Sequence, residues 1–230
     1  GNSGGPVLKD GNIVGVAMQG ITSSQNIGYM IPVPVITHFL DDVKREHAEG
    51  VPTLGILGHN TERRSMRRYY GIPDTEGGVV VTHVAPFSSA DGLLQEGDVI
   101  LGLDGVPISS DGTVPFRDSE RLDMSYVISS KHVGDEVTVK CLRGGTISTP
   151  KIMLKRFQDL VPAANAYTKP SYYIYGGLGF TVLSTDLMNE WRNALDLDSE
   201  SLIPLSFKYW AYGAGALNEK RKKELVVLSE

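Results

Sequence analysis

Ser3 is the residue of this chain whose surroundings point most directly to chemistry. It stands in the run GNSGGP at residues 1–6. A serine hydroxyl is a weak nucleophile until a base removes its proton, and acyl transfer also needs donors where the oxyanion develops. In a tight turn of small residues, the backbone N–H groups of Gly1 and Ser3 would point into one cavity as an oxyanion hole. The run therefore predicts a nucleophile loop, with a solvated Gly-rich hairpin turn as the alternative.

The chain offers 5 histidines as candidate bases, and all of them follow the serine in the sequence. We expect none of them to act as the base for Ser3. His38 and His47 fall on or at the end of a predicted helix, where exposure to solvent or a favourable interaction with the helix dipole accounts for a histidine. His59 and His132 fall in predicted loops, and His83 follows a run of valines. No group of histidine, cysteine and acidic residues has metal-ligand spacing, so the sequence predicts neither a metal nor a cofactor.

Composition limits the class of protein. The 230 residues are 41% hydrophobic and 21% charged, which is typical of globular domains and excludes disorder over the whole chain. A formal net charge of −5 argues against a nucleic-acid-binding surface over the whole chain. The single cysteine, Cys141, excludes an intrachain disulfide, and its alternation with Val137 and Val139 indicates a buried thiol rather than a reactive one. No apolar run approaches the ~18 residues of a transmembrane helix.

Residues 1–48 carry the elements expected to position the serine. A turn signal at 9–12 is followed by predicted strands at 13–18 and 26–31. Pro34 suits the first turn of a helix, where its missing N–H costs nothing. Apolar residues then recur at helical spacing, while Asp41 and Asp42 face away. We expect an amphipathic helix that packs its apolar stripe on the strands, formed by Val35, Ile36, Phe39, Leu40 and Val43.

Two further units follow a short linker at 50–52. In the unit at 53–157, strands are predicted to begin at 54–56 and 78–81, helices at 90–94 and 118–130, and a hairpin joins 136–142 to 146–154. In the unit at 158–230, strands are predicted at 172–175 and 225–228, with a helix stripe formed by Leu187, Met188, Trp191 and Leu195. The chain is therefore predicted to be mainly β with short helices, of mixed β and α+β class.

Several of these motifs together resemble the Deg/HtrA family of serine endoproteases. The resemblance rests on GNSGGP at 1–6, on NIGYMIP at 26–32 and on the helix after it. The runs GVVV at 78–81, ADGLL at 90–94 and EGDVI at 96–100 resemble the PDZ signature, and DGTVPFR at 111–117 resembles the eukaryotic, plant-type branch. The resemblance implies the end of a chymotrypsin-like β-barrel at 1–48, a PDZ domain at 53–157, and a divergent, truncated second PDZ domain at 158–230.

The resemblance also assigns roles in the protease part. Ser3 would be the nucleophile, with the oxyanion hole formed by the N–H groups of Gly1 and Ser3. The segment Met18, Gln19 and Gly20 resembles the strand that pairs with the substrate backbone. The family carries its catalytic His and Asp earlier in the chain than the serine. We therefore expect a C-terminal fragment that is inactive by itself.

The PDZ units imply peptide binding by β-augmentation, in which a peptide adds a strand to an open sheet edge and an apolar-Gly-apolar loop holds its carboxylate. The candidates are Leu54, Gly55 and Ile56 in the first PDZ unit and Leu178, Gly179 and Phe180 in the second. Ordinary strand starts with core side chains are the alternative. The second unit has two further alternatives, namely that it mediates assembly or is blocked by its own chain.

The resemblance implies an ATP-independent serine endopeptidase that acts on unfolded or damaged proteins. Its partners would be polypeptide substrates and peptide termini, and it would form a homo-oligomer, a trimer or larger. The branch points to a chloroplast, a mitochondrion or a nucleus. The alternatives are a catalytically inactive PDZ scaffold or chaperone, and a generic PDZ adaptor with an accidental Gly-rich start.

Overall fold

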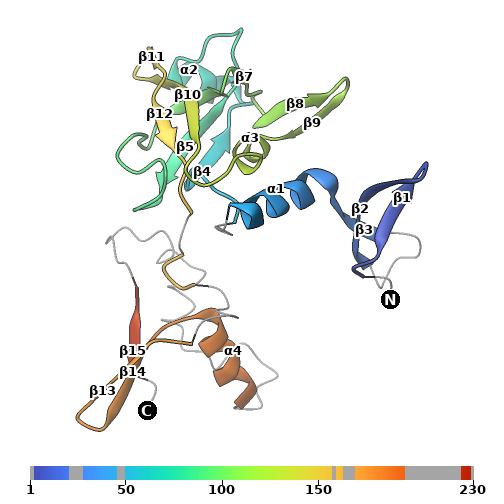
Figure 1. The fold of residues 1–230 in the computed structure, drawn as a ribbon. Coiled ribbons are helices and arrows are strands. Elements are labelled where there is room, and N and C mark those ends of the chain that lie inside the picture. The colour runs from blue at the N-terminus through green and yellow to red at the C-terminus, as the bar shows by residue number, and fades with distance from the viewer. Residues whose placement is uncertain are drawn as a thin grey trace.

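The structure is a computed structural model that describes residues 3–20, 28–45, 50–156, 159–162, 169–194 and 224–228. Within these ranges the chain is mainly β-strand with short helices, which confirms the predicted fold class. The strands group in chain order as β1–β3, β4–β12 and β13–β15 (Figure 1). The described strands form no closed barrel. None of the helices in these ranges is long and apolar enough to cross a membrane.

The first group is an antiparallel sheet in the order β1-β2-β3. β1 (Pro6–Lys9) and β2 (Asn12–Gly20) are joined by Asp10 and Gly11, whose φ angles are 51° and 78°. Positive φ at both central residues is the geometry of a type I′ hairpin turn, which the Asp-Gly pair favours. β3 (Gly28–Pro32) leads directly into α1 (Val33–Lys44), which has a proline in its first turn. These elements confirm the predicted turn, strands and helix start.

The helix α1 does not bury the face that its sequence pattern predicts. Val35, Phe39 and Val43 are 51%, 60% and 50% exposed, whereas Asp42 is only 5% exposed. The prediction that Asp42 faces away was wrong, because this side of the helix is covered by the following domain, where Asp42 pairs with His132. Helical periodicity identifies an apolar face, but it does not say which neighbour covers which face.

The second group contains the largest described sheet, with the order β11-β10-β6-β5-β4 and with β7 and β12 attached to β6 and β10, and a separate two-stranded sheet of β8 and β9. All its pairings are antiparallel. Its core side chains, such as Leu103, Val139 and Ile152, are fully buried. β4 ends the order, so no described strand pairs with its outer edge. The strands are β4 (Ile56–Asn60), β5 (Val79–Val84), β6 (Val99–Leu103), β7 (Val106–Pro107), β10 (Glu136–Arg143), β11 (Thr146–Ser148) and β12 (Lys151–Met153).

The helix predicted over 118–130 is mostly replaced by a hairpin. β8 (Thr113–Arg117) pairs with β9 (Glu120–Asp123), and only α3 (Ser125–Ser129) is helical. The guanidinium of Arg121 holds β9 in place, since it donates to the hydroxyls of Thr113 and Ser109. These contacts come from outside the segment, so its own apolar spacing did not predict them.

Two smaller helix assignments also differ from the sequence pattern. Residues 90–94 were expected to be helical, but they form turns, with Gly92 at a φ of +79°. The helix α2 (Arg64–Tyr70) was not predicted. It packs only Met66 and Tyr70 on the sheet, and two contacts in a seven-residue helix are too few to form a recognisable stripe.

The third group is a sheet in the order β13-β14-β15. β13 (Tyr172–Tyr175) and β14 (Leu178–Val182) form a hairpin, α4 (Thr185–Ala194) follows, and β15 (Val226–Leu228) pairs with β14. Gly176 and Gly177 make the hairpin turn at φ angles of 60° and 82°, a region that favours glycine. The strands predicted at 172–175 and 225–228 and the predicted helix are confirmed, whereas Leu195 of its stripe lies outside the described residues and β14 was not predicted.

Candidate functional site

Ser3 lies in an exposed turn that is fastened to the middle strand of the first sheet. The N–H of Gly4 donates to the carbonyl of Ala17 at 2.7 Å, and the N–H of Ala17 donates to the carbonyl of Gly5 at 2.9 Å. Gly4 has a φ of +87° and nothing within 4 Å of the position of a Cβ. Gly4 is therefore favoured because of its positive φ, and not because a neighbouring atom leaves no room for a side chain.

The turn brings Ser3 against the segment that was predicted to bind the substrate backbone. The hydroxyl of Ser3 donates to the carbonyl of Met18 at 2.9 Å. The register between β2 and β3 shifts between Ala17 and Gln19, so Met18 occupies a bulge, and its side chain is 54% exposed. Bulges redirect side chains and recur beside active sites.

Two of the other site residues predicted within residues 1–48 lie in β2. Gln19 and Gly20 continue β2 and pair with Tyr29 and Gly28 of β3. Gly1 lies outside the described residues. The histidines that the structure describes belong to α1, β4, β5 and the turn after α3, and none lies in the sheet that carries the serine.

The predicted carboxylate loop of the second group leads into the open edge strand β4. The carbonyls of Leu54 and Gly55 accept hydrogen bonds from the N–H groups of Ala90 and Ala85 at 3.1 Å and 2.8 Å. Gly55 has a φ of +72°, which explains the glycine. Leu54 is 4% exposed and belongs to the core, whereas Ile56 begins the strand. Core packing and backbone hydrogen bonds thus hold the loop rigidly at the start of an edge with which no described strand pairs.

The hydroxyl groups of Thr53 and Ser89 stabilise the same loop through hydrogen bonds to the backbone. Thr53 Oγ1 accepts the N–H of Gly55 at 3.2 Å, and the Thr53 carbonyl accepts the hydroxyl of Ser89 at 2.6 Å. Ser89 also accepts the N–H of Lys155 at 2.8 Å, which ties the loop to the end of the domain. Because the N–H of Gly55 already has an acceptor, a bound carboxylate would compete with Thr53 for it.

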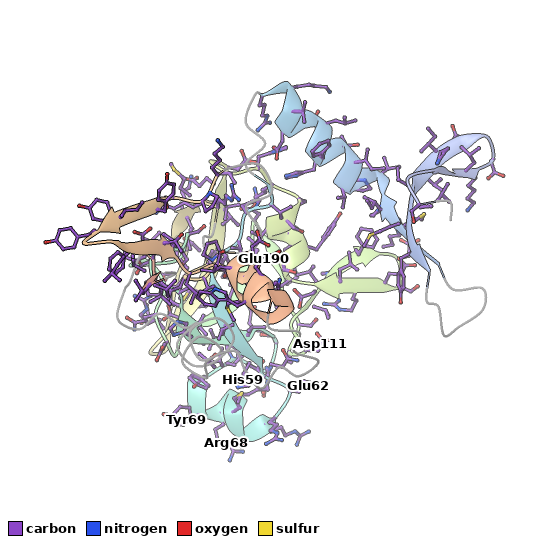
Figure 2. The ribbon with its side chains drawn as sticks, turned by 90° about the horizontal axis from the view of Figure 1, so that it is seen from below. His59, Glu62, Arg68, Tyr69, Asp111 and Glu190 are labelled. Atoms are coloured by element: carbon purple, nitrogen blue, oxygen red, sulfur yellow. The ribbon has the colours of Figure 1, made fainter. Side chains whose placement is uncertain are left out.

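The far end of β4 borders a cavity of about 550 Å³ between this strand and α2. Figure 2 shows His59 and Glu62 where β4 approaches α2, with Arg68 and Tyr69 on the helix surface. His59 was predicted in a loop but lies in β4 and is exposed. The cavity is lined by Gly58, His59, Asn60, Glu62, Arg63 and Met66.

Comparison with known proteins finds two kinds of similarity, to PDZ domains and to proteases. Residues 52–154 and 161–230 each match a sequence family described as PDZ domain. The chain is 42% identical over 194 residues to Protease Do-like 2, chloroplastic, of Arabidopsis thaliana, in a match that covers 83% of this chain and 32% of the relative. This chain is similar to plant Deg/HtrA proteases. It is also 34% identical over 216 residues to Protease Do-like 4, mitochondrial, of the same species, covering 94% of this chain and 40% of that relative.

The chain spans well under half the length of the curated relatives that it matches. Among solved structures, an HtrA-type protease, AlgW, with a decapeptide is 22% identical, with a TM-score of 0.44, 63% coverage of this chain and 42% of that chain. Another, AlgWS227A with a decapeptide, is 24% identical, with a TM-score of 0.47 and coverages of 69% and 44%.

The described elements of the second PDZ match resemble part of the first. β14 pairs with β15 and β4 pairs with β5, both antiparallel, and a helix begins soon after β14 and soon after β4. The difference is the outer edge, because β13 pairs with β14 where β4 has no described partner. Phe180 pairs with Tyr173 on one side and Leu228 on the other, and Leu178 and Gly179 pair with β13.

The buried charged and thiol groups of the first PDZ match support the fold. Asp98 is fully buried and accepts two hydrogen bonds from Arg143, each at 2.7 Å. Cys141 is also fully buried, as its alternation with valines predicts. Burial, together with the nearby charge of Asp98, raises the pKa of the Cys141 thiol to about 11, so the thiol stays protonated and unreactive.

The sequence interpretation missed one cluster of side chains. Asp42 Oδ1 lies 2.6 Å from His132 Nδ1, and Asp42 Oδ2 lies 3.7 Å from His38 Nε2. The side chains of His38, Asp42 and His132 are only 11%, 8% and 15% exposed. His38 and Asp42 stand four residues apart on α1, and that spacing was the available signal. The third member comes from the next domain, which spacing along the chain does not reveal.

Proposed function

We propose that these residues belong to an ATP-independent serine endopeptidase that degrades unfolded or damaged proteins. Similarity to plant Deg/HtrA proteases supports this class, and the observation that carries it is the Ser3 turn, which is hydrogen-bonded to β2 beside Met18. Ser3 attacks the scissile carbonyl, and the N–H groups of Gly1 and Ser3 stabilise the oxyanion. A histidine and an aspartate outside these 230 residues act as the general base and its orienting partner.

The position of the hydroxyl defines what the base must do. The proton of Ser3 is donated to the carbonyl of Met18, which is an acceptor but not a base of useful strength. Activation therefore requires the hydroxyl to turn from Met18 toward the histidine. Met18, Gln19 and Gly20 then pair with the substrate backbone beside the nucleophile, at the bulge of β2.

Labelling with a fluorophosphonate probe tests this assignment. The full-length protein is expected to label at Ser3, because the probe reacts only with a serine that a base has activated. A polypeptide of these 230 residues alone is expected not to label, since its Ser3 hydroxyl donates to Met18. The measurement is mass spectrometry of the labelled peptide.

The two samples of the labelling experiment, the full-length protein and the 230 residues alone, each test one part of the assignment. Labelling of the 230 residues at the rate of the full-length protein would show that the base is within them. No labelling of the folded full-length protein would favour the alternative function, a catalytically inactive PDZ scaffold or chaperone.

We also propose that the first PDZ domain binds peptide termini at the edge of β4. The unpaired edge and the rigid loop at 54–56 support this role. The peptide adds a strand beside β4, and the loop formed by Leu54, Gly55 and Ile56 holds its terminal carboxylate. The domain division that goes with this proposal is 1–48, 53–157 and 158–230.

Replacing Gly55 with glutamate is expected to weaken binding of C-terminal peptides by at least about 100-fold, or about 2.7 kcal/mol. The added carboxylate repels the peptide carboxylate, and a side chain at this φ of +72° strains the loop. Fluorescence anisotropy with a labelled apolar C-terminal peptide measures the dissociation constant.

A matched control separates the charge at the loop from the strain of the substitution. Gly105 lies in the turn between β6 and β7 with a φ of +80°, so Gly105→Glu adds the same side chain to a similar backbone conformation. This variant is expected to bind peptide as the native protein does. Equal affinities of Gly55→Glu and the native protein would exclude the loop as the carboxylate site.

For the second PDZ domain we propose regulation or assembly through the same kind of edge. Leu178, Gly179 and Phe180 remain the candidate carboxylate loop, but β13 already pairs with this strand. A peptide would have to displace β13, which favours a domain blocked by its own chain or one that joins subunits. We propose a homo-oligomer, a trimer or larger.

A further inference from the structure

The cluster of His38, Asp42 and His132 joins two parts of the chain that have separate folds. His38 and Asp42 lie on α1, after the Ser3 sheet, and His132 lies in the turn after α3 of the first PDZ domain. One donor atom from each of the three side chains can be chosen so that all lie within 4.8 Å of one another. Figure 1 shows α1 extending to the PDZ domain near α3, where this contact is made.

One member of the cluster lacks a partner that its burial requires. His38 Nε2 is buried and makes no hydrogen bond, since its 3.7 Å distance from Asp42 Oδ2 is too long for one. A buried polar atom without a partner costs free energy comparable to a lost hydrogen bond. The nitrogen faces a carboxylate, so a cation between the two would satisfy both groups.

We propose that His38, Asp42 and His132 bind a zinc ion that fastens α1 to the first PDZ domain. Two imidazole nitrogens and a carboxylate oxygen form a ligand set that suits Zn²⁺. Zn²⁺ has no geometric preference from its d electrons, and water would complete the four-coordinate site. Mg²⁺ and Ca²⁺ prefer oxygen ligands, so two histidines select against them.

The donor atoms need only a local adjustment to reach zinc. Bonds of about 2.0–2.2 Å at tetrahedral angles place ligand atoms about 3.3 Å apart. The two imidazole rings now stack with centroids 4.2 Å apart and an interplanar angle of 15°. Each ring must therefore rotate about its Cβ–Cγ bond so that both nitrogens point at one ion, and this torsion has broad minima.

The surroundings favour a cation at this place. A cavity of about 370 Å³ adjoins His38 and Asp42 and is lined by apolar side chains that include Phe39, Val51 and Tyr126. The hydroxyl residues Ser129 and Ser130 also line this cavity. The cavity also leaves room for the water ligand.

Zinc titration of the tag-free chain tests the site, with a competing chelator to report the affinity and Co²⁺ as a spectroscopic probe. We expect about one Zn²⁺ per chain, and tetrahedral absorption with Co²⁺. His38→Gln and His132→Gln are each expected to weaken zinc binding by at least about 100-fold, because even outer-shell changes cost 10- to 100-fold. His59→Gln, which alters an exposed histidine on β4, is expected to leave the affinity unchanged.

Hydrogen exchange tests whether zinc stabilises the contact between α1 and the first PDZ domain or binds there without stabilising it. Zinc is expected to slow exchange of the amides of α1, residues 33–44, in the native chain but not in His132→Gln, whose fold is first verified by circular dichroism. Absence of stoichiometric zinc binding would overturn the proposal. So would zinc affinity that survives either ligand substitution, or exchange in α1 that does not respond to zinc.

Discussion

Ser3→Ala in the full-length protein is expected to lower kcat for a polypeptide substrate by about 10⁶-fold, with little change in KM. Alanine removes the proposed nucleophile and leaves the proposed oxyanion hole and the proposed substrate strand at Met18 unchanged. The residual rate then reflects transition-state stabilisation by those groups alone. The measurement is the initial rate of casein or fluorogenic peptide cleavage at saturating substrate.

A second serine provides the control for this substitution. Ser119 is exposed in the turn between β8 and β9, far along the chain from the nucleophile turn, and Ser119→Ala is expected to keep full activity. If Ser3→Ala retained more than about one per cent of the native kcat, another nucleophile would be responsible.

Arg143→Met is expected to destabilise the first PDZ domain by about 3 kcal/mol, measured as the free energy of unfolding in urea. The substitution leaves the carboxylate of Asp98 fully buried without its bidentate partner. The N–H of Gln95 still donates to it at 2.9 Å, so one hydrogen bond of the group survives. Breaking a buried ion pair from one side costs more than the pair contributes, because the remaining charge is not solvated.

The effect of Arg143→Met should depend on pH in a defined direction. Burial by itself raises the pKa of Asp98, but the hydrogen bonds from Arg143 and Gln95 outweigh it and hold the pKa below its usual value. A lowered pKa stabilises the fold above the unfolded value of about 3.9, and this stabilisation is lost as pH falls through the folded pKa. The difference between the native protein and the variant should therefore be largest near pH 7 and shrink below about pH 4.

Lys151→Met is the matched control for the pair. Lys151 and Glu136 form an ion pair at 2.8 Å, but their side chains are 67% and 54% exposed. Solvent screens this pair, so the substitution should leave the free energy of unfolding nearly unchanged. Equal destabilisation by Arg143→Met and Lys151→Met would contradict the importance of burial at Asp98.

The sequence alone determined features that depend on a few adjacent residues. Asp10 and Gly11 specify the first hairpin, because these residues reach positive φ at low cost. Pro34 marks the start of α1 for the same local reason. The alternation of Cys141 with valines predicted its burial. The motif around Ser3 also predicted the family.

Only the tertiary structure decided which surfaces are covered. The apolar spacing of α1 is real, yet Asp42 is buried and Phe39 is exposed, since the neighbour that covers the helix lies in another domain. Likewise, the apolar-Gly-apolar runs of the two PDZ domains look alike in sequence, but β13 occupies the edge of β14 while that of β4 has no described partner. Contacts such as the one between Asp42 and His132 join segments far apart in the chain. Local propensity and periodicity carry no information about them.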